Sequence, residues 1–198
     1  NHIRELPSES ATQKWTAWDL GVSDSTSIWV CETLGGEVRL MDYYENHGQP
    51  LDHYIGWLDE KGYRDYTHIL PHDVNVRELQ TGKSRYEFLT EAGLNIDVAA
   101  KLSVEDGIMA VRKMLPNAWF NKETTKFGLE CLRNYRRVFN EKLNVYQEKP
   151  LHDWSSHCSD AFRYLAVGID TQGTSTRSNW NKPFESTYDG ESYKNQYL

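Results

Sequence analysis

The chain of 198 residues contains 29 acidic and 22 basic side chains, which give a formal net charge of −7 at pH 7. This length suffices to bury a hydrophobic core in one domain of about 150 residues without metal or disulfide cross-links. The sequence shows no apolar run of roughly 20 residues, and residues 1–10 lack the apolar segment of a signal peptide. We therefore expect an intracellular protein with no membrane partner.

Cysteine usage indicates a reducing environment. Cys31, Cys131 and Cys158 are widely spaced and form neither a Cys-x-x-Cys pair nor a Cys/His zinc motif, so we expect buried apolar side chains. The first residue is Asn1 rather than a methionine, and we expect a domain excised from a longer chain.

Charge is unevenly distributed along the chain. Residues 1–106 hold 19 acidic and 9 basic residues, whereas residues 107–149 hold 4 acidic and 9 basic residues. A basic third within an acidic protein is compatible with a nucleic-acid partner, because the local distribution of charge matters more than its sum.

The first half of the chain predicts strands around one helix. Residues 1–12 are polar and predict a linker, and residues 14–47 contain three β-branched and aromatic runs, the last two joined by a double-glycine turn typical of a hairpin. Asp19 ends the first of these three antiparallel strands. Residues 51–61 place apolar side chains on one helical face, and the run 66–71 predicts a fourth strand that its proline ends, just before Asp73.

The second half predicts helices that alternate with short strands. The expected helices cover residues 83–92, 103–115, 124–139 and 155–168, and the expected strands cover residues 95–100, 118–120 and 144–147. Ser103 and Asp106 form a capping pattern at the start of one helix. Residues 171–198 are rich in Ser, Thr, Asn and Gly and predict a polar flexible tail, which leaves residues 13–170 as the folded domain.

This order of elements predicts an α/β domain of the ribonuclease H-like class, with a central mixed β-sheet, three antiparallel N-terminal strands and flanking helices. In such a domain Asp19 and Asp73 end neighbouring central strands, and Asp160 faces them from the last helix.

Three converging carboxylates suit a pair of Mg²⁺ or Mn²⁺ ions about 4 Å apart, which hydrolyse phosphodiesters. Asp19 is the candidate for the shared ligand, with Asp73 and Asp160 on either side. A single aspartate after a strand is more often a turn residue or a helix cap, so the hypothesis rests on their joint placement.

The last helix carries a second polar pattern. If it begins near Asp153, then Asp153, His157, Asp160 and Tyr164 share one face. His157 could orient Asp160 or contact a phosphate, and Asp153 could bind metal. The alternatives are a structural His157 and a capping Asp153, and the cap is the favoured role for Asp153.

Basic residues supply candidate contacts to DNA phosphates. Gly82-Lys83-Ser84 is not a phosphate loop, because Arg77 stands where the first glycine of that motif belongs. A basic helix is also commonly just a solvated face. The candidates for DNA contact are Lys83, Arg85, Lys122, Lys126, Arg133, Arg136 and Arg137. Without a base-stacking platform, we expect cutting that depends weakly on sequence.

Several blocks resemble the C-terminal nuclease domain of the large terminase subunit of tailed bacteriophages. The resemblance covers residues 13–170, and its most specific part is the closing HDWSSHCSDAFRY. The blocks are WDLGVSDST, LPHDVNVRELQTGKSRYEFL, GIMAVRKMLPNAWFN, GLECLRNYRR and HDWSSHCSDAFRYLAVG.

The resemblance implies a Mg²⁺- or Mn²⁺-dependent endonuclease that cuts concatemeric viral DNA during genome packaging. Its catalytic acids carry over to Asp19, Asp73 and Asp160, and Asp24, Asp153 and His157 are secondary candidates within the matching blocks. It also implies an N-terminal ATPase domain in the same chain, the portal or procapsid and the small terminase subunit as partners, and action in the host cytoplasm at the procapsid portal.

Two alternatives stay open at this point. One is a Holliday-junction resolvase or integrase-like nuclease of the same fold. The other is a DNA- or portal-docking module whose aspartates are only caps and turn residues.

Overall fold

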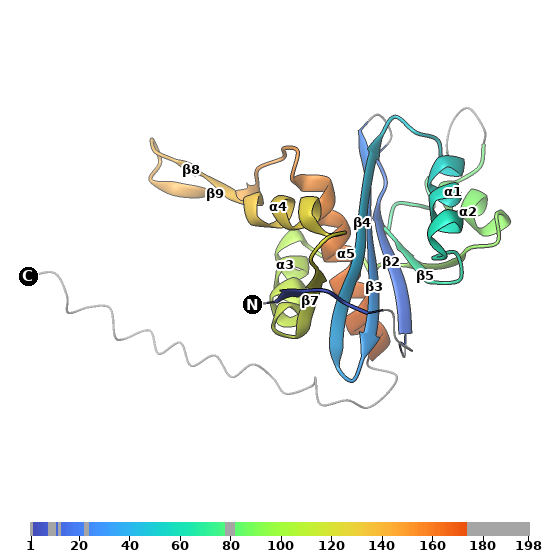
Figure 1. Ribbon diagram of the computed structural model, residues 1–198. Helices are drawn as coiled ribbons and strands as arrows, with labels where there is room; N and C mark the ends of the chain where they lie inside the picture. The colour runs from blue at the N-terminus through green and yellow to red at the C-terminus, as the bar shows by residue number, and fades with distance from the viewer. Residues whose placement is uncertain (1, 8–10, 12, 22–23, 78–81, 174–198) are drawn as a thin grey trace, which may run out of the picture.

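A seven-stranded mixed sheet forms the centre of the computed structural model, which describes residues 2–7, 11, 13–21, 24–77 and 82–173 (Figure 1). The strand order is β1-β7-β4-β3-β2-β5-β6. The strands are β1 (Ile3–Arg4), β2 (Gln13–Asp19), β3 (Ser25–Leu34), β4 (Glu37–His47), β5 (Thr67–Leu70), β6 (Asn95–Val98) and β7 (Ala118–Asn121). The sheet confirms the predicted ribonuclease H-like class.

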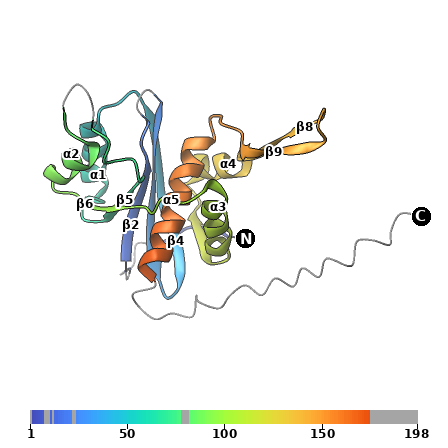
Figure 2. The same ribbon diagram turned by 180° about the vertical axis from the view of Figure 1, so that it is seen from behind.

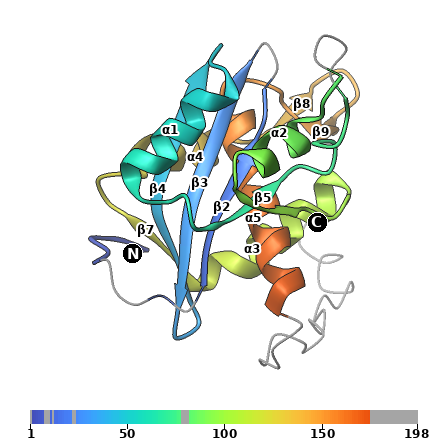
Figure 3. The same ribbon diagram turned by 90° about the vertical axis from the view of Figure 1, so that its right-hand side faces the viewer.

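Helices cover both faces of this sheet (Figures 1 and 2). One face carries α1 (Leu51–Lys61) and α2 (Arg85–Glu91), which lie on the viewer's side in Figure 3. The other face carries α3 (Val104–Met114), α4 (Lys126–Asn134) and α5 (Ser156–Gly173). A short 3₁₀ turn, η1 (Leu115–Asn117), joins α3 to β7.

The antiparallel part of the sheet follows from local sequence. Gly35 and Gly36 both have positive φ, +59° and +88°, which a tight turn between β3 and β4 requires. Residues of β2 pair with β3 in antiparallel register and with β5 in parallel register. Asp19 therefore ends one central strand, and Asp73 follows the strand beside it.

Successive side chains of β2 point to opposite faces of the sheet and belong to two separate hydrophobic cores. Trp15 and Ala17 pack with α5 and α3 residues on one face, and Trp18 packs with α1 residues on the other. On that second face the Trp18 indole nitrogen donates to Thr16 Oγ1 at 2.6 Å, and Thr16 Oγ1 lies 2.7 Å from His68 Nδ1 on β5. The three side chains hold β2 and β5 in register.

The predicted basic helix is wrong in its second half. It ends at Asn134, whose side chain donates to the Glu130 carbonyl at 2.8 Å, and Tyr135 is extended. The chain then forms a projecting hairpin of β8 (Arg137–Asn140) and β9 (Val145–Pro150), since the Val138–Phe139 pair favours a strand over a helix. Arg136 and Arg137 are therefore not on a helix.

The two ends of the predicted domain also differ from expectation. Ile3 and Arg4, in the predicted linker, form an edge strand that pairs with β7 in parallel. The last helix begins at Ser156 and continues to Gly173, past the predicted end at residue 168. Residues 174–198 of the predicted tail lie outside the described residues.

None of the described helices has the length and apolar character needed to cross a bilayer.

The close approach of α4 to β3 gives a test of the packing. A Cβ on Gly128 would lie 2.5 Å from Trp29 Cη2, inside a fully buried aromatic cluster. We expect Gly128→Ala to destabilise the fold by about 1–3 kcal/mol, measured by urea unfolding. Gly56→Ala, at an exposed position of α1 where a Cβ meets nothing within 4 Å, is the control and should be neutral or stabilising. Equal stabilities of the two variants would contradict this packing.

Candidate metal centre

Asp19 is the last residue of β2, and its side chain points to the face of the sheet that α5 covers. Its backbone pairs with Ser27 of β3, and its side chain is 17% exposed. Asp73 follows β5 by three residues and is exposed. Because β2 and β5 run parallel, their carboxyl ends meet at the same edge of the sheet, where open α/β sheets bind ligands.

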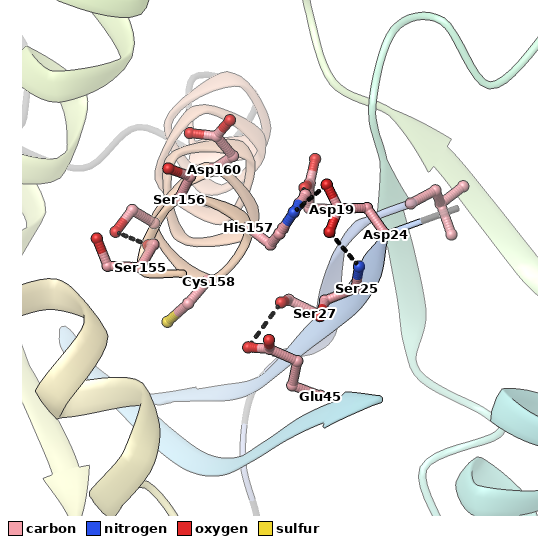
Figure 4. Close-up of polar contacts among 12 residues, drawn as sticks. Asp19, Asp24, Ser25, Ser27, Glu45, Ser155, Ser156, His157, Cys158 and Asp160 are labelled. Carbon is pink, nitrogen blue, oxygen red and sulfur yellow. Dashed lines mark hydrogen bonds and ion pairs between the residues drawn. The ribbon is translucent and has the colours of Figure 1, made fainter. Parts of the chain in front are cut away.

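Helix α5 brings His157 and Asp160 to this edge. The helix packs against β2 and β3, and the Trp29 indole nitrogen donates to the Cys158 carbonyl at 3.0 Å. His157 Nδ1 lies 2.9 Å from Asp19 Oδ2, and Asp160 projects from the same helix nearby (Figure 4). The structure thus joins residues that are 138 positions apart in sequence.

The phenol of Tyr164 on α5 feels the charge of all three predicted aspartates. The pKa of its phenol is raised to about 12, chiefly by burial and then by the negative charges of Asp19, Asp160 and Asp73. The charges of all three aspartates therefore act on one side chain of α5, Tyr164.

Asp19 has the environment of a cation ligand. Burial raises the pKa of its carboxyl group, the hydrogen bond from His157 lowers it, and the Asp160 charge raises it again. A divalent cation would offset the repulsion between the half-buried carboxylates of Asp19 and Asp160. The all-oxygen donors of Asp19, Asp73 and Asp160 fit Mg²⁺ or Mn²⁺.

His157 bridges two carboxylates. Its Nε2 lies 3.1 Å from Asp24 Oδ2, while Nδ1 contacts Asp19. The hydrogen bond with Asp19 is the main cause that raises the pKa of His157 to about 9, and Asp24 contributes to the same shift. The imidazole is therefore a cation at neutral pH and offsets part of the acidic charge.

Arg163 supports Asp160 and was not predicted from the sequence. Its Nη2 lies 2.6 Å from Asp160 Oδ1, three residues earlier on α5. Gly107 of α3 leaves room for this arginine, since a Cβ there would lie 3.2 Å from Arg163 Nη1. The i, i+3 spacing of Asp160 and Arg163 is the sequence signal that could have identified the pair.

Asp153 has local partners instead. It precedes α5, so the predicted four-residue stripe does not begin on the helix, and its Oδ1 accepts from Ser155 N at 2.9 Å and Ser155 Oγ at 2.6 Å. Its Oδ2 lies 3.5 Å from Arg136 Nη1. These bonds favour the capping role.

Arg85 is the predicted basic residue that the structure brings beside Asp19. Its Nη1 donates to the carbonyl of Leu20 at 3.1 Å, directly after β2. Several of the others pair with surface acids: Lys83 with Glu91, Lys122 and Lys126 with Glu123, Arg136 with Asp153, and Arg137 with Glu105. Arg133 is exposed on α4. Ser84, of the Gly-Lys-Ser segment, caps α2, as a helix start requires.

One compact group of possible metal ligands was not predicted as a set. Within the described ranges, Asp24, His152 and His157 are the three side chains whose donor atoms all lie within 4.8 Å of one another. Asp19, Asp73 and Asp160 do not form a group this compact within the described ranges.

Solved structures share this architecture. The P22 large terminase nuclease domain matches with a TM-score of 0.65 and 18% identity, over 85% of this chain and 87% of that one. The nuclease domain of the bacteriophage SPP1 large terminase, solved with bound Mn, matches with a TM-score of 0.58 and 14% identity, over 85% and 95% of the two chains.

A longer protein also matches. The large terminase of a thermophilic bacteriophage, solved in complex with ATP-gamma-S, gives a TM-score of 0.65 and 18% identity over 83% of this chain, which spans 42% of that protein. No protein-family model matches the sequence, and no curated protein does either. At these identities the comparisons show the fold, which is that of the large terminase nuclease domains.

The His157 bridge predicts a titration in metal-free protein. We expect its imidazole to titrate near pH 9 in NMR spectra, and Asp19→Asn to lower that pKa because the main partner loses its charge. The stability that the Asp19–His157 pair contributes should be present below about pH 6.5 and lost as the pH rises through about 9. Asp52→Asn, an exposed acid of α1, is the control. An unchanged His157 titration in Asp19→Asn would contradict the contact.

Proposed function

We propose that this chain is a metal-dependent endonuclease domain of a bacteriophage large terminase, which cuts double-stranded DNA during genome packaging. The observation that carries the proposal is the meeting of Asp19 with His157 and Asp160, beside the strand that leads to Asp73. The fold shared with the P22 and SPP1 nuclease domains supports the same role.

Asp19, Asp73 and Asp160 are the residues that would hold two divalent cations, Mg²⁺ or Mn²⁺, with Asp19 as the shared ligand. Bound ions of this kind activate a water molecule on one side of a phosphate and stabilise the leaving oxygen on the other. The bound Mn of the SPP1 domain supports a divalent ion in this fold.

Basic side chains beside the carboxylates hold them in place for metal binding. His157 holds Asp19 Oδ2 in place, and Arg163 holds Asp160 Oδ1. Both partners are cations, so they reduce the repulsion between the acids before any metal arrives. Arg85, next to the end of β2, is placed to contact a DNA phosphate.

The biological setting follows from the same proposal. The substrate would be concatemeric viral DNA. The domain would act at the procapsid portal in the host cytoplasm, and its partners would be the portal and the small terminase subunit. An ATPase domain of the same chain would drive translocation, in keeping with the complex of the longer thermophilic-phage terminase with ATP-gamma-S. By itself this domain would cleave DNA but would not move it.

The first test replaces the central carboxylate. Asp19→Asn should lower Mg²⁺-dependent cleavage of plasmid DNA by on the order of 10³-fold or more, because several kcal/mol of charge stabilisation are lost. Asp52→Asn is the matched control and should cleave normally, and chelation of divalent ions should stop cleavage by the parent protein. Circular dichroism would show that the fold of each variant is intact.

The same assay separates the alternatives. A strong preference for four-way junctions over linear and plasmid DNA would support a resolvase instead. Unchanged cleavage by Asp19→Asn would remove Asp19 from the mechanism, and no cleavage by the parent with any divalent ion would support a docking module.

The placement of Arg85 gives a second test. Arg85→Ala should weaken duplex binding and reduce the slope of log K against log salt by about 0.9, the value for one phosphate contact. Lys61→Ala, in the last turn of α1, is the control and should keep the parent slope. Equal slopes for parent and Arg85→Ala would place this arginine outside the DNA contact.

A further inference from the structure

Asp24, His152 and His157 form a group of nitrogen and oxygen donors beside Asp19. Asp24 directly precedes β3, His152 lies in the segment between β9 and α5, and His157 is in the first turn of α5. The rings of His152 and His157 are 5.6 Å apart and nearly perpendicular, at 79°. Three separate segments thus bring donor atoms to within 4.8 Å of one another.

Once a bound ion replaces the proton on Nε2, His157 has the orientation of a metal-binding histidine. Its Nδ1 faces Asp19 at 2.9 Å, and its Nε2 points to Asp24 Oδ2 at 3.1 Å. A histidine ligand usually donates its second ring nitrogen to a carboxylate, which fixes the ring and the tautomer. Asp24 is itself fixed, because its Oδ1 accepts from Ser25 N at 3.1 Å and leaves Oδ2 directed at His157 (Figure 4).

We propose that Asp24, His152 and His157 form a mononuclear site for a transition-metal ion such as Zn²⁺ or Co²⁺, distinct from the all-carboxylate site proposed for Asp19, Asp73 and Asp160. Two imidazoles and one carboxylate match the donor preference of these ions, whereas Mg²⁺ prefers oxygen donors only. Three protein ligands leave a further coordination position open to water.

His157 connects this site to Asp19, the central carboxylate of the proposed nuclease site. An ion on Nε2 leaves Nδ1 as a donor to Asp19, so Asp19 becomes the outer partner of the transition-metal ligand. The site therefore shares one side chain with the proposed nuclease chemistry, but it binds its ion whether or not the protein cleaves DNA.

The test is a titration of metal-free protein with Co²⁺, followed by visible absorption, and with Zn²⁺, followed by calorimetry. We expect one Zn²⁺ to bind per chain through these residues. His152→Ala should weaken Zn²⁺ binding by at least about 100-fold, because loss of an outer partner alone costs 10–100-fold. His47→Ala, at the exposed end of β4, is the matched control and should bind as the parent does.

Three results would overturn the proposal: no Zn²⁺ or Co²⁺ binding to the parent, equal binding by His152→Ala, or loss of the Co²⁺ spectrum in Asp73→Asn alone. Cleavage with Mg²⁺ gives an independent readout, since His152 has no role in the proposed nuclease and His152→Ala should still cut DNA. A protein that binds Zn²⁺ through His152 but never cleaves DNA would keep this inference and lose the proposed function.

Discussion

The placement of α5 against β2 and β3 is the contact on which the site depends. Ala161, Phe162 and Leu165 are buried in the core shared with Trp29, whose indole nitrogen also bonds the α5 backbone at Cys158. With that face of the helix fixed, the adjoining face has to present His157 to Asp19. Hydrophobic packing therefore sets the geometry of a polar site without taking part in its chemistry.

Half-buried aspartates that lie close together repel one another, and a folded protein needs positive charge beside them to offset that repulsion. Two basic side chains of α5 supply it: His157 pairs with Asp19, and Arg163 pairs with Asp160. The free energy cost of burying Asp19 is thereby reduced before any ion binds. An exposed group such as Asp73 needs no such partner, because water solvates it.

Much of the architecture could be predicted from local patterns, and so could the three aspartates. Alternating strands, the double glycine at residues 35 and 36 and the Ser103 cap are each set by short-range chemistry, and each is found in the structure. The strand predicted over residues 144–147 corresponds to β9, whereas β8 was missed because its basic residues also suit a helix. The β1–β7 pair and the Asp24–His152–His157 group were missed because they form only between segments far apart in sequence.

The hydrogen-bonded group of Trp18, Thr16 and His68 has an effect on the opposite face of the sheet. Successive side chains of a strand point to opposite sides, so the register that these three residues fix under α1 also decides where Asp19 emerges relative to the end of β5. A slip of one residue would turn Asp19 away from α5 and bury a charge beneath α1. An indole and an imidazole on the α1 side of the sheet thereby align the edge that carries Asp19 on the α5 side.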